Sequence, residues 1–145
     1  MATLQVTIEE SVNINGKTRG SSITKTIPDI SRVYHQVLNP VSEQTIFTFG
    51  SPANAAGSFD SADVEFLRIT NINESAATST LRIVGLVDEA YVVKLNQNDS
   101  FVLFDNQIDA LTGASAGTDV ISATGIDYIT ASGNAEIEIF VAASE

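Results

Sequence analysis

Cysteine is absent from this chain of 145 residues, and histidine occurs once, at position 35. The lack of cysteine excludes disulfide bonds, thiolate ligands and cysteine nucleophiles. Zinc is not expected either, because proteins hold it mainly with cysteine and histidine. The pair Gly113 and Gly117 lacks the lysine that a phosphate-cradling loop needs. The sequence therefore predicts neither a metal nor a cofactor.

Basic residues are also scarce, since 7 Lys and Arg face 18 Asp and Glu and leave a formal charge of −11. Such a surface repels phosphate, so neither nucleic acid nor an anionic membrane is an expected partner. No apolar run is long enough for a transmembrane helix. The opening MATLQVTIEE has neither the basic nor the apolar region of a signal peptide. These features predict a soluble protein whose partners are other proteins.

The few basic residues are concentrated at the N-terminal end. The 51 residues after Lys94 contain eight acids and no basic residue, which makes the C-terminal third strongly acidic. The basic N-terminal residues are our candidates for a partner interface, and they are Lys17, Arg19, Lys25 and Arg32.

Hydrophobic residues alternate with polar ones from the start of the chain. Leu4, Val6 and Ile8 alternate with polar side chains, which predicts a half-buried strand. Asn15-Gly16 favours the tight turn of a β-hairpin, because both residues tolerate positive φ. We therefore expect an N-terminal β-hairpin over residues 1–27 that projects as a docking arm. We expect a bulge at Gly20 and an end to the strand at Pro28-Asp29.

The remaining residues, 28–145, contain short alternating segments separated by turns every 8–12 residues. Residues 30–38 fit a helical face or a strand, and their β-branched and aromatic content favours a strand. A second hairpin is expected over residues 91–104, reversing at Asn96–Asp99. Further strands are expected at 45–49, 64–70, 80–87, 120–129 and 136–141. This pattern predicts an all-β, single-domain β-sandwich. We prefer a jelly-roll-like order, with an immunoglobulin-like order left open.

Catalytic groups are hard to find in this chain. His35 lies in an apolar run with no G-x-S-x-G motif to support a catalytic triad, so a packed or surface role is favoured. Asp63 and Glu65 fall on the solvent side of a strand, which disfavours a glycosidase pair. The oxygen-rich segment 105–109 does not have EF-hand spacing for calcium. We therefore expect no enzyme activity and no catalytic or metal-binding residues.

Five segments of the chain resemble small β-rich structural proteins of marine tailed phages, including cyanophages. The most recognisable piece is Leu67-Arg68-Ile69-Thr70-Asn71, followed by the turn around Asn96–Asp99, which lacks the glycine common in similar chains. The resemblance covers nearly the whole chain and no functional residue carries over from it. The segments are TLQVTIEESVNINGKTRGSS, ISRVYHQVLNPVSEQTIFTFG, VEFLRITNINESAATSTLRIV, AYVVKLNQNDSFVLFDN and AEIEIFVAAS.

The resemblance implies a virion structural protein on the capsid surface, made in the host cytoplasm. Its first form is a capsid decoration (cement) protein that binds the major capsid protein or other virion proteins, as a homo-oligomer with a trimer favoured. The alternative within the same class is a head-fibre, knob or tail-associated module that binds carbohydrate or a receptor. Against that alternative, the chain has no Trp and 3 Tyr, which provide little aromatic surface for a sugar.

Overall fold

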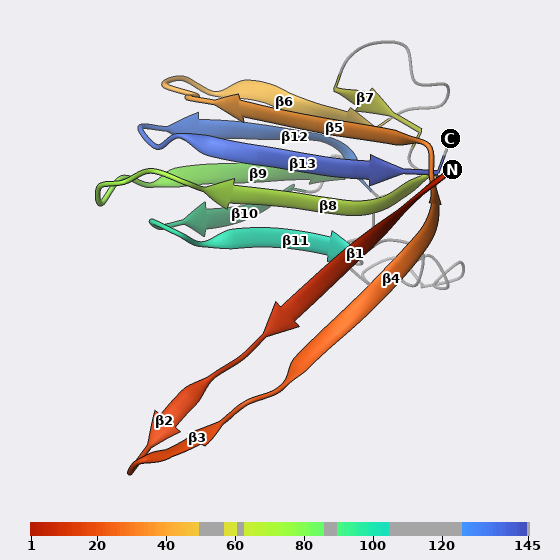
Figure 1. Ribbon diagram of the computed structural model, residues 1–145. Coiled ribbons are helices and arrows are strands. Elements are labelled where there is room, and N and C mark those ends of the chain that lie inside the picture. The colour runs from red at the N-terminus through yellow and green to blue at the C-terminus, as the bar shows by residue number, and fades with distance from the viewer. Residues whose placement is uncertain (50–56, 61–62, 86–89, 105–125, 145) are drawn as a thin grey trace, which may run out of the picture.

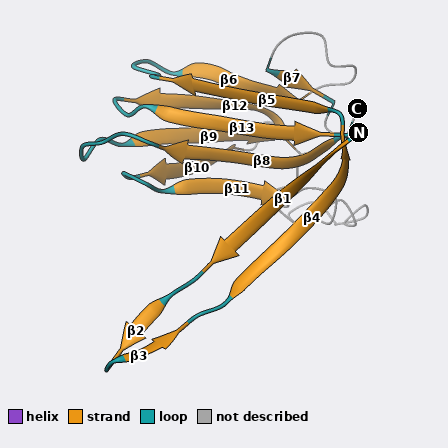
Figure 2. Cartoon of the chain, viewed as in Figure 1, coloured by secondary structure: helices purple, strands orange, loops and turns teal. Residues whose placement is uncertain are grey.

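The computed structural model describes residues 1–49, 57–60, 63–85, 90–104 and 126–144, and none of these lies in a helix (Figure 2). The chain is an all-β protein whose strands form a sandwich of two sheets and a separate arm (Figure 1). In the ambiguous segment 30–38, residues Arg32–Leu38 form a strand of the sandwich and Ile30 ends a strand of the arm, so the favoured prediction of a strand is confirmed.

Two sheets pack face to face in the sandwich (Figure 1). The five-stranded sheet has the order β10 (Ala90–Leu95), β9 (Ser79–Gly85), β12 (Ile126–Gly133), β6 (Gln44–Phe49) and β7 (Ser58–Phe59). The four-stranded sheet has the order β11 (Ser100–Phe104), β8 (Val64–Asn71), β13 (Ile137–Ala143) and β5 (Arg32–Leu38). Of the expected strand at 120–129, residues 120–125 lie outside the described residues.

The core follows directly from the alternation along the strands. In β13, Ile137, Ile139 and Val141 are fully buried, whereas Glu138 and Phe140 point to the other face. Phe47 and Phe59 stack at 5.2 Å between the sheets and are also fully buried. Burial of such side chains contributes about 1.5–3 kcal/mol each, so one contiguous core holds the two sheets together.

The strands alternate between the two sheets along the chain. From β5 to β13, consecutive strands lie in different sheets except for the β6–β7 and β9–β10 pairs. A double-sheet jelly roll is wound in this alternating way. The strand order therefore agrees with the preferred form of the sandwich prediction.

The prediction of a second hairpin over residues 91–104 is wrong. The reversal at Asn96–Asp99 is present, but β10 pairs with β9 and β11 pairs with β8 in the opposite sheet. The Asn96 amide donates to the Asp99 carboxylate at 2.9 Å, which stabilises an arch between the sheets. Alternation shows which face of a strand is buried but not which strand is its neighbour, so a hairpin and an arch look alike in the sequence.

The N-terminal arm is a long two-stranded ribbon formed by residues 1–30, and it projects away from the sandwich (Figure 1). β1 (Ala2–Glu9) pairs with β4 (Ser22–Ile30), and beyond them β2 (Val12–Ile14) pairs with β3 (Lys17–Arg19). The predicted irregularity at Gly20 lies between the two pairings. Gly20 has a φ of 153°, and a Cβ atom there would lie 1.8 Å from the Glu10 carbonyl oxygen, so only glycine fits.

Pro28-Asp29 does not end the strand, which corrects the prediction. β4 continues to Ile30, because the pairing shifts between Ala2 and Leu4 and leaves Pro28 and Asp29 in a bulge. A bulge tolerates a proline, since the extra residue needs no ladder hydrogen bond. Asp29 adopts a φ of 62°, which aspartate accepts more readily than most residues. The arm therefore ends at Ile30 and not at residue 27.

A single buried amide joins the turns at the end of the sandwich farthest from the base of the arm. Asn71 is fully buried, and its Nδ2 donates to the carbonyl oxygens of Ala77 at 2.9 Å and Leu95 at 3.1 Å. Its Oδ1 accepts from the backbone amide of Asn73 at 3.0 Å. These bonds satisfy polar backbone groups that would otherwise be buried without partners.

We predict that Asn71→Ala lowers the free energy of unfolding by about 3 kcal/mol, because two buried carbonyls and one amide lose their partner. Chemical denaturation followed by fluorescence or circular dichroism measures the change. The matched control is Asn134→Ala, since Asn134 is exposed and its Oδ1 accepts at 3.4 Å; its effect should stay below about 0.5 kcal/mol. Equal effects of the two substitutions would contradict the role of Asn71.

Candidate protein-docking surface

The base of the arm packs on the four-stranded sheet. Ile27 and Ile30 of β4 are each 3% exposed and form a separate cluster with Phe66 and Ala142 of that sheet. Leu4 and Val6 of β1, and Phe104 and Phe140 of the sheet, pack against this cluster. These contacts cover one end of the sheet surface that faces away from the core, and they fix the direction in which the arm leaves the sandwich.

The distal arm keeps its apolar character but loses its cover. Residues paired directly across β1 and β4 share a face, so Ile8 and Ile23 continue the side that carries Leu4 and Ile27. The exposed fraction is 51% for Ile8 and 67% for Ile23. We call Ile8, Ile23, Val12 and Ile14, which are all at least half exposed, the distal apolar residues.

The four-stranded sheet has a second uncovered apolar surface. We call the side that faces away from the core the outer face; strand pairing places its residues in three rows. Beyond the base of the arm, Val33, Val37 and Val102 are 55%, 43% and 39% exposed on this face. The rows, from the arm base outward, are Phe104–Phe66–Ala142–Val33, Val102–Arg68–Phe140–His35 and Ser100–Thr70–Glu138–Val37.

A chain of polar contacts crosses the outer face between these apolar side chains. Glu138 lies at its centre, 2.8 Å from Nε2 of His35 and 2.5 Å from Nη2 of Arg68. Arg68 also donates to Thr70 at 2.9 Å, and Thr70 lies 2.8 Å from the Ser100 hydroxyl. The hydrogen bond from His35 and the nearby Arg68 guanidinium hold the pKa of Glu138 below its ordinary value of 4.5, although partial burial opposes the shift.

The contact with Glu138 holds His35 in an exposed ion pair. Its side chain is 54% exposed, and the ring lies 6.2 Å from that of Phe140 on β13. Asp63 and Glu65 are half-buried, and Glu65 accepts a hydrogen bond from the Ser144 hydroxyl at 3.2 Å. The geometry around His35 is that of a cross-strand pair with Glu138 of β13.

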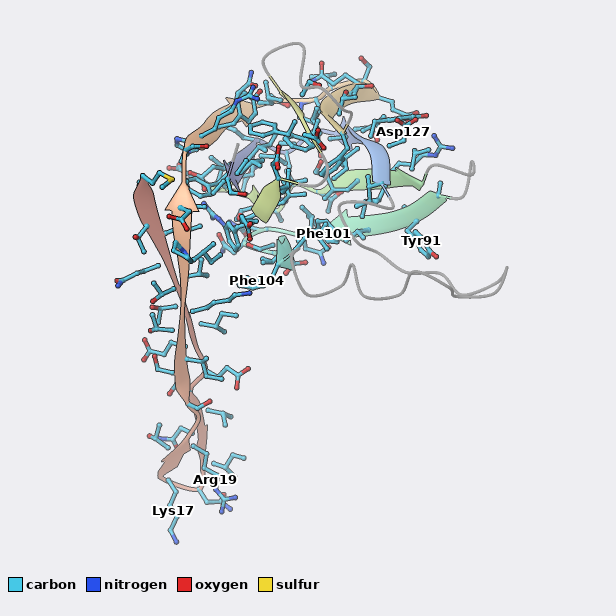
Figure 3. The ribbon with its side chains drawn as sticks, turned by 90° about the vertical axis from the view of Figure 1, so that its right-hand side faces the viewer. Lys17, Arg19, Tyr91, Phe101, Phe104 and Asp127 are labelled. Atoms are coloured by element: carbon cyan, nitrogen blue, oxygen red, sulfur yellow. The ribbon has the colours of Figure 1, made fainter. Side chains whose placement is uncertain are left out.

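The four basic candidate residues do not form one cluster. Lys17 and Arg19 lie together at the exposed tip of the arm, as far from the sandwich as the chain reaches (Figure 3). Lys25 instead lies at the base, where its ammonium is 5.3 Å from the centre of the Phe104 ring. Arg32 belongs to β5, and its guanidinium lies 4.0 Å above the Phe59 ring. Lys17 and Arg19 therefore form the tip of the surface, and the other two contribute to packing within the chain.

The sequence alone did not lead us to expect the distal apolar residues in this surface. The alternation predicts Ile8 on the inward side of a half-buried strand, whereas Ile8 is 51% exposed on β1 of the arm. A signal was available, because Val12 and Ile14 continue the alternation up to the Asn15-Gly16 turn. Apolar residues that recur along a strand up to its turn need a surface of similar length to bury them.

Metal-binding clusters and membrane-spanning helices are absent from the described part of the chain, which does contain a cavity. No group of three or more potential metal-binding side chains is found there, and the oxygen-rich segment 105–109 lies outside it. A helix able to span a membrane is not found among the same residues. A cavity of about 240 Å³ opens between β5 and β6, with Tyr34, Gln36 and Gln44 in its lining.

Comparisons with known proteins do not assign this surface. The chain matches no protein-family model, and neither curated proteins nor solved structures give a match to it. The candidate surface therefore consists of the arm and the outer face, defined by geometry alone.

We predict that Glu138→Gln lowers the melting temperature slightly at neutral pH, by an amount equivalent to no more than about 1 kcal/mol. A carboxylate with a lowered pKa in the folded state stabilises the fold above its ordinary pKa and loses this effect as the pH falls through the lowered value. The difference between variant and wild type should therefore vanish at strongly acidic pH. Thermal unfolding across a pH series measures it, with the exposed Glu136→Gln as the control.

A constant difference between Glu138→Gln and the wild-type protein at every pH would show that the Glu138 charge does not contribute through its ion pairs. An equal, pH-dependent loss in Glu136→Gln would attribute the effect to net charge and not to the contacts with His35 and Arg68.

Proposed function

We propose that this protein is a structural component of a tailed-phage particle, and that it decorates and stabilises the capsid shell through protein–protein contacts. The observation that carries the proposal is the projecting arm, whose distal apolar residues are at least half exposed and are not covered by any other described part of the chain. Contiguous exposed apolar residues on a soluble protein are typical of an interaction surface. The phage assignment rests on the sequence resemblance and adds the identity of the partner.

The physical state of the arm supports a docking role. A two-stranded ribbon is at best marginally stable in water, so the distal part gains order when another chain covers it. Both edges of the ribbon also offer unpaired backbone groups that can extend a neighbour's sheet. The arm is thus suited to inserting between other folded chains.

The sandwich supports a passive role for the rest of the protein. Its two sheets share one core that includes Phe47, Leu67 and Ile129, all at most 1% exposed. Such a body is rigid. When many identical copies bind one particle, their individually weak contacts together give strong attachment to the particle. We propose no catalytic step, since the groups around His35 form a surface ion pair.

The alternative function, carbohydrate binding by a fibre or knob, would use the cavity between β5 and β6. Its lining includes Tyr34, Gln36, Gln44 and Thr48, which can hydrogen-bond a sugar. The cavity of about 240 Å³ is smaller than the roughly 300–1,000 Å³ of most small-ligand sites. The exposed arm has no role in this alternative, so we prefer the decoration function. Glycan-array binding that is lost in Tyr34→Ala would favour the alternative.

We predict that this chain is present in purified phage particles at a copy number comparable with that of the major shell protein. Quantitative mass spectrometry of the particles measures the ratio. A copy number far below that of the shell protein would move the protein to the neck, tail or spike. Its absence from particles would refute the proposal.

We predict that reversing the charge at the arm tip, in the double variant Lys17→Glu, Arg19→Glu, weakens binding to particles that lack the protein by at least about tenfold. The reason is that the tip carries two of the seven basic residues of a strongly acidic chain. The control is Arg82→Glu, Lys94→Glu, which makes the same change of charge on exposed residues of the five-stranded sheet. Equal loss in the two variants would attribute the effect to net charge.

A further inference from the structure

Each copy of the protein has two uncovered apolar surfaces, one on the arm and one on the outer face. We infer that the distal arm of one copy seats on the outer face of a second copy, so that the copies are linked by their arms. The inference deepens the proposed function, because it rests on the arm as the docking element and names its first partner.

The base of the arm shows that the two surfaces fit each other. There the same side of the ribbon already packs on the same sheet, with Ile27 and Ile30 against Phe66 and Ala142. Both surfaces then continue uncovered, the ribbon as Ile8 and Ile23 and the sheet as its exposed valines. The chain therefore already makes one contact of this kind within itself, between aliphatic side chains of the ribbon and aliphatic and aromatic side chains of the sheet.

Charge favours a second copy over an unrelated partner. The three basic residues of the arm balance its three acidic ones, so the whole formal charge of −11 resides in residues 31–145. Between Ile8 and Ile23, the basic residues Lys17 and Arg19 lie at the tip of the arm, and the acidic residues Glu9 and Glu10 lie nearer the sandwich. The basic tip of the arm therefore meets a complementary acidic body in every other copy of this chain.

The acids of the sandwich lie where the arm tip would reach. Exposed Glu74, Asp99 and Glu136 belong to turns at the end of the sandwich opposite the arm base. Hydrogen bonds join these turns. The backbone amide of Asn71 donates to the Asp99 carbonyl oxygen, and that of Ile72 donates to the Glu136 carbonyl oxygen, each at 3.0 Å. No Lys or Arg occurs in the turn segments 72–78, 96–99 and 134–136. This acidic end borders the third row of the outer face.

The lengths of the two surfaces also agree. Val33 pairs with Ala142 of β13, and Ala142 lies six positions after Glu136, which is a distance of roughly 20 Å at the rise of a strand. Ile8 lies six positions from Ile14, which pairs with Lys17 at the tip, so the arm spans roughly the same 20 Å. An arm laid lengthwise with Ile8 near Val33 would therefore place Lys17 and Arg19 at the acidic turns.

An arm-to-face contact joins two different surfaces, so each copy both gives an arm and receives one. Such a contact is heterologous, and it closes into a ring when the rotation between neighbours permits. This asymmetry yields a complementation test that a dimer held arm to arm or face to face would fail. One variant is defective only in its arm, and the other is defective only in its face.

The arm variant is Ile8→Asp, Ile23→Asp, and the face variant is Val37→Asp, Val102→Asp; all four side chains are exposed in the single chain, so both variants should fold. Light scattering coupled to size-exclusion chromatography gives the mass. We expect the wild-type protein to be an oligomer and each variant to associate at least about tenfold more weakly. A mixture of the two variants should form a dimer, because one intact arm then meets one intact face.

The control is Val92→Asp, Arg82→Asp, which places two aspartates on exposed positions of the five-stranded sheet and should leave the oligomer intact. A monomeric wild-type protein, or a mixture that stays monomeric while the variants are folded by circular dichroism, would overturn the inference. Binding of the same variants to particles lacking the protein separates the two proposals. If oligomers form but no variant or wild-type protein binds particles, the decoration function fails and the inference stands. If the wild-type protein binds particles as a monomer, the inference fails and the decoration function stands.

Discussion

The contact between β4 and the outer face of the four-stranded sheet determines most of what this protein presents to its surroundings. Ile27 and Ile30 bury themselves against Phe66 and Ala142 and so anchor a ribbon that would be marginal on its own. The anchor covers only the proximal part of the ribbon. The rest of the apolar side must then project beyond the sandwich, where no other part of the described chain covers it. One small cluster therefore produces both the shape of the protein and its exposed surface.

The charge distribution separates the roles of arm and body. With the arm neutral overall and the body at −11, two bodies repel each other when they approach directly. An arm approaching a body meets no such repulsion, and its tip with Lys17 and Arg19 is attracted. High negative charge on the sandwich thus discourages unspecific association between sheets, and the arm remains as the favourable route to contact.

The sequence predicts a large part of the fold because alternation is a local property. The all-β class, the sandwich and the N-terminal hairpin all follow from period-two patterns and from the Asn15-Gly16 turn. The arch at Asn96–Asp99 could not be separated from a hairpin, since the choice of neighbouring strand depends on the packing of two sheets. Pro28 was misread because a bulge removes the usual cost of proline within a strand, and the bulge depends on the partner strand.

The candidate surface was less predictable, because exposure depends on what lies behind a strand. The alternation of Leu4, Val6 and Ile8 predicts a strand with one buried side, yet burial ends between Val6 and Ile8 in the single chain. The two statements are compatible if the sequence was selected in an assembly where another surface covers Ile8. On this argument, a side chain that the pattern predicts to be buried but that the single chain leaves exposed marks an interface. Ile8 meets that condition, and Val12 and Ile14, which continue its alternation, are exposed in the same way.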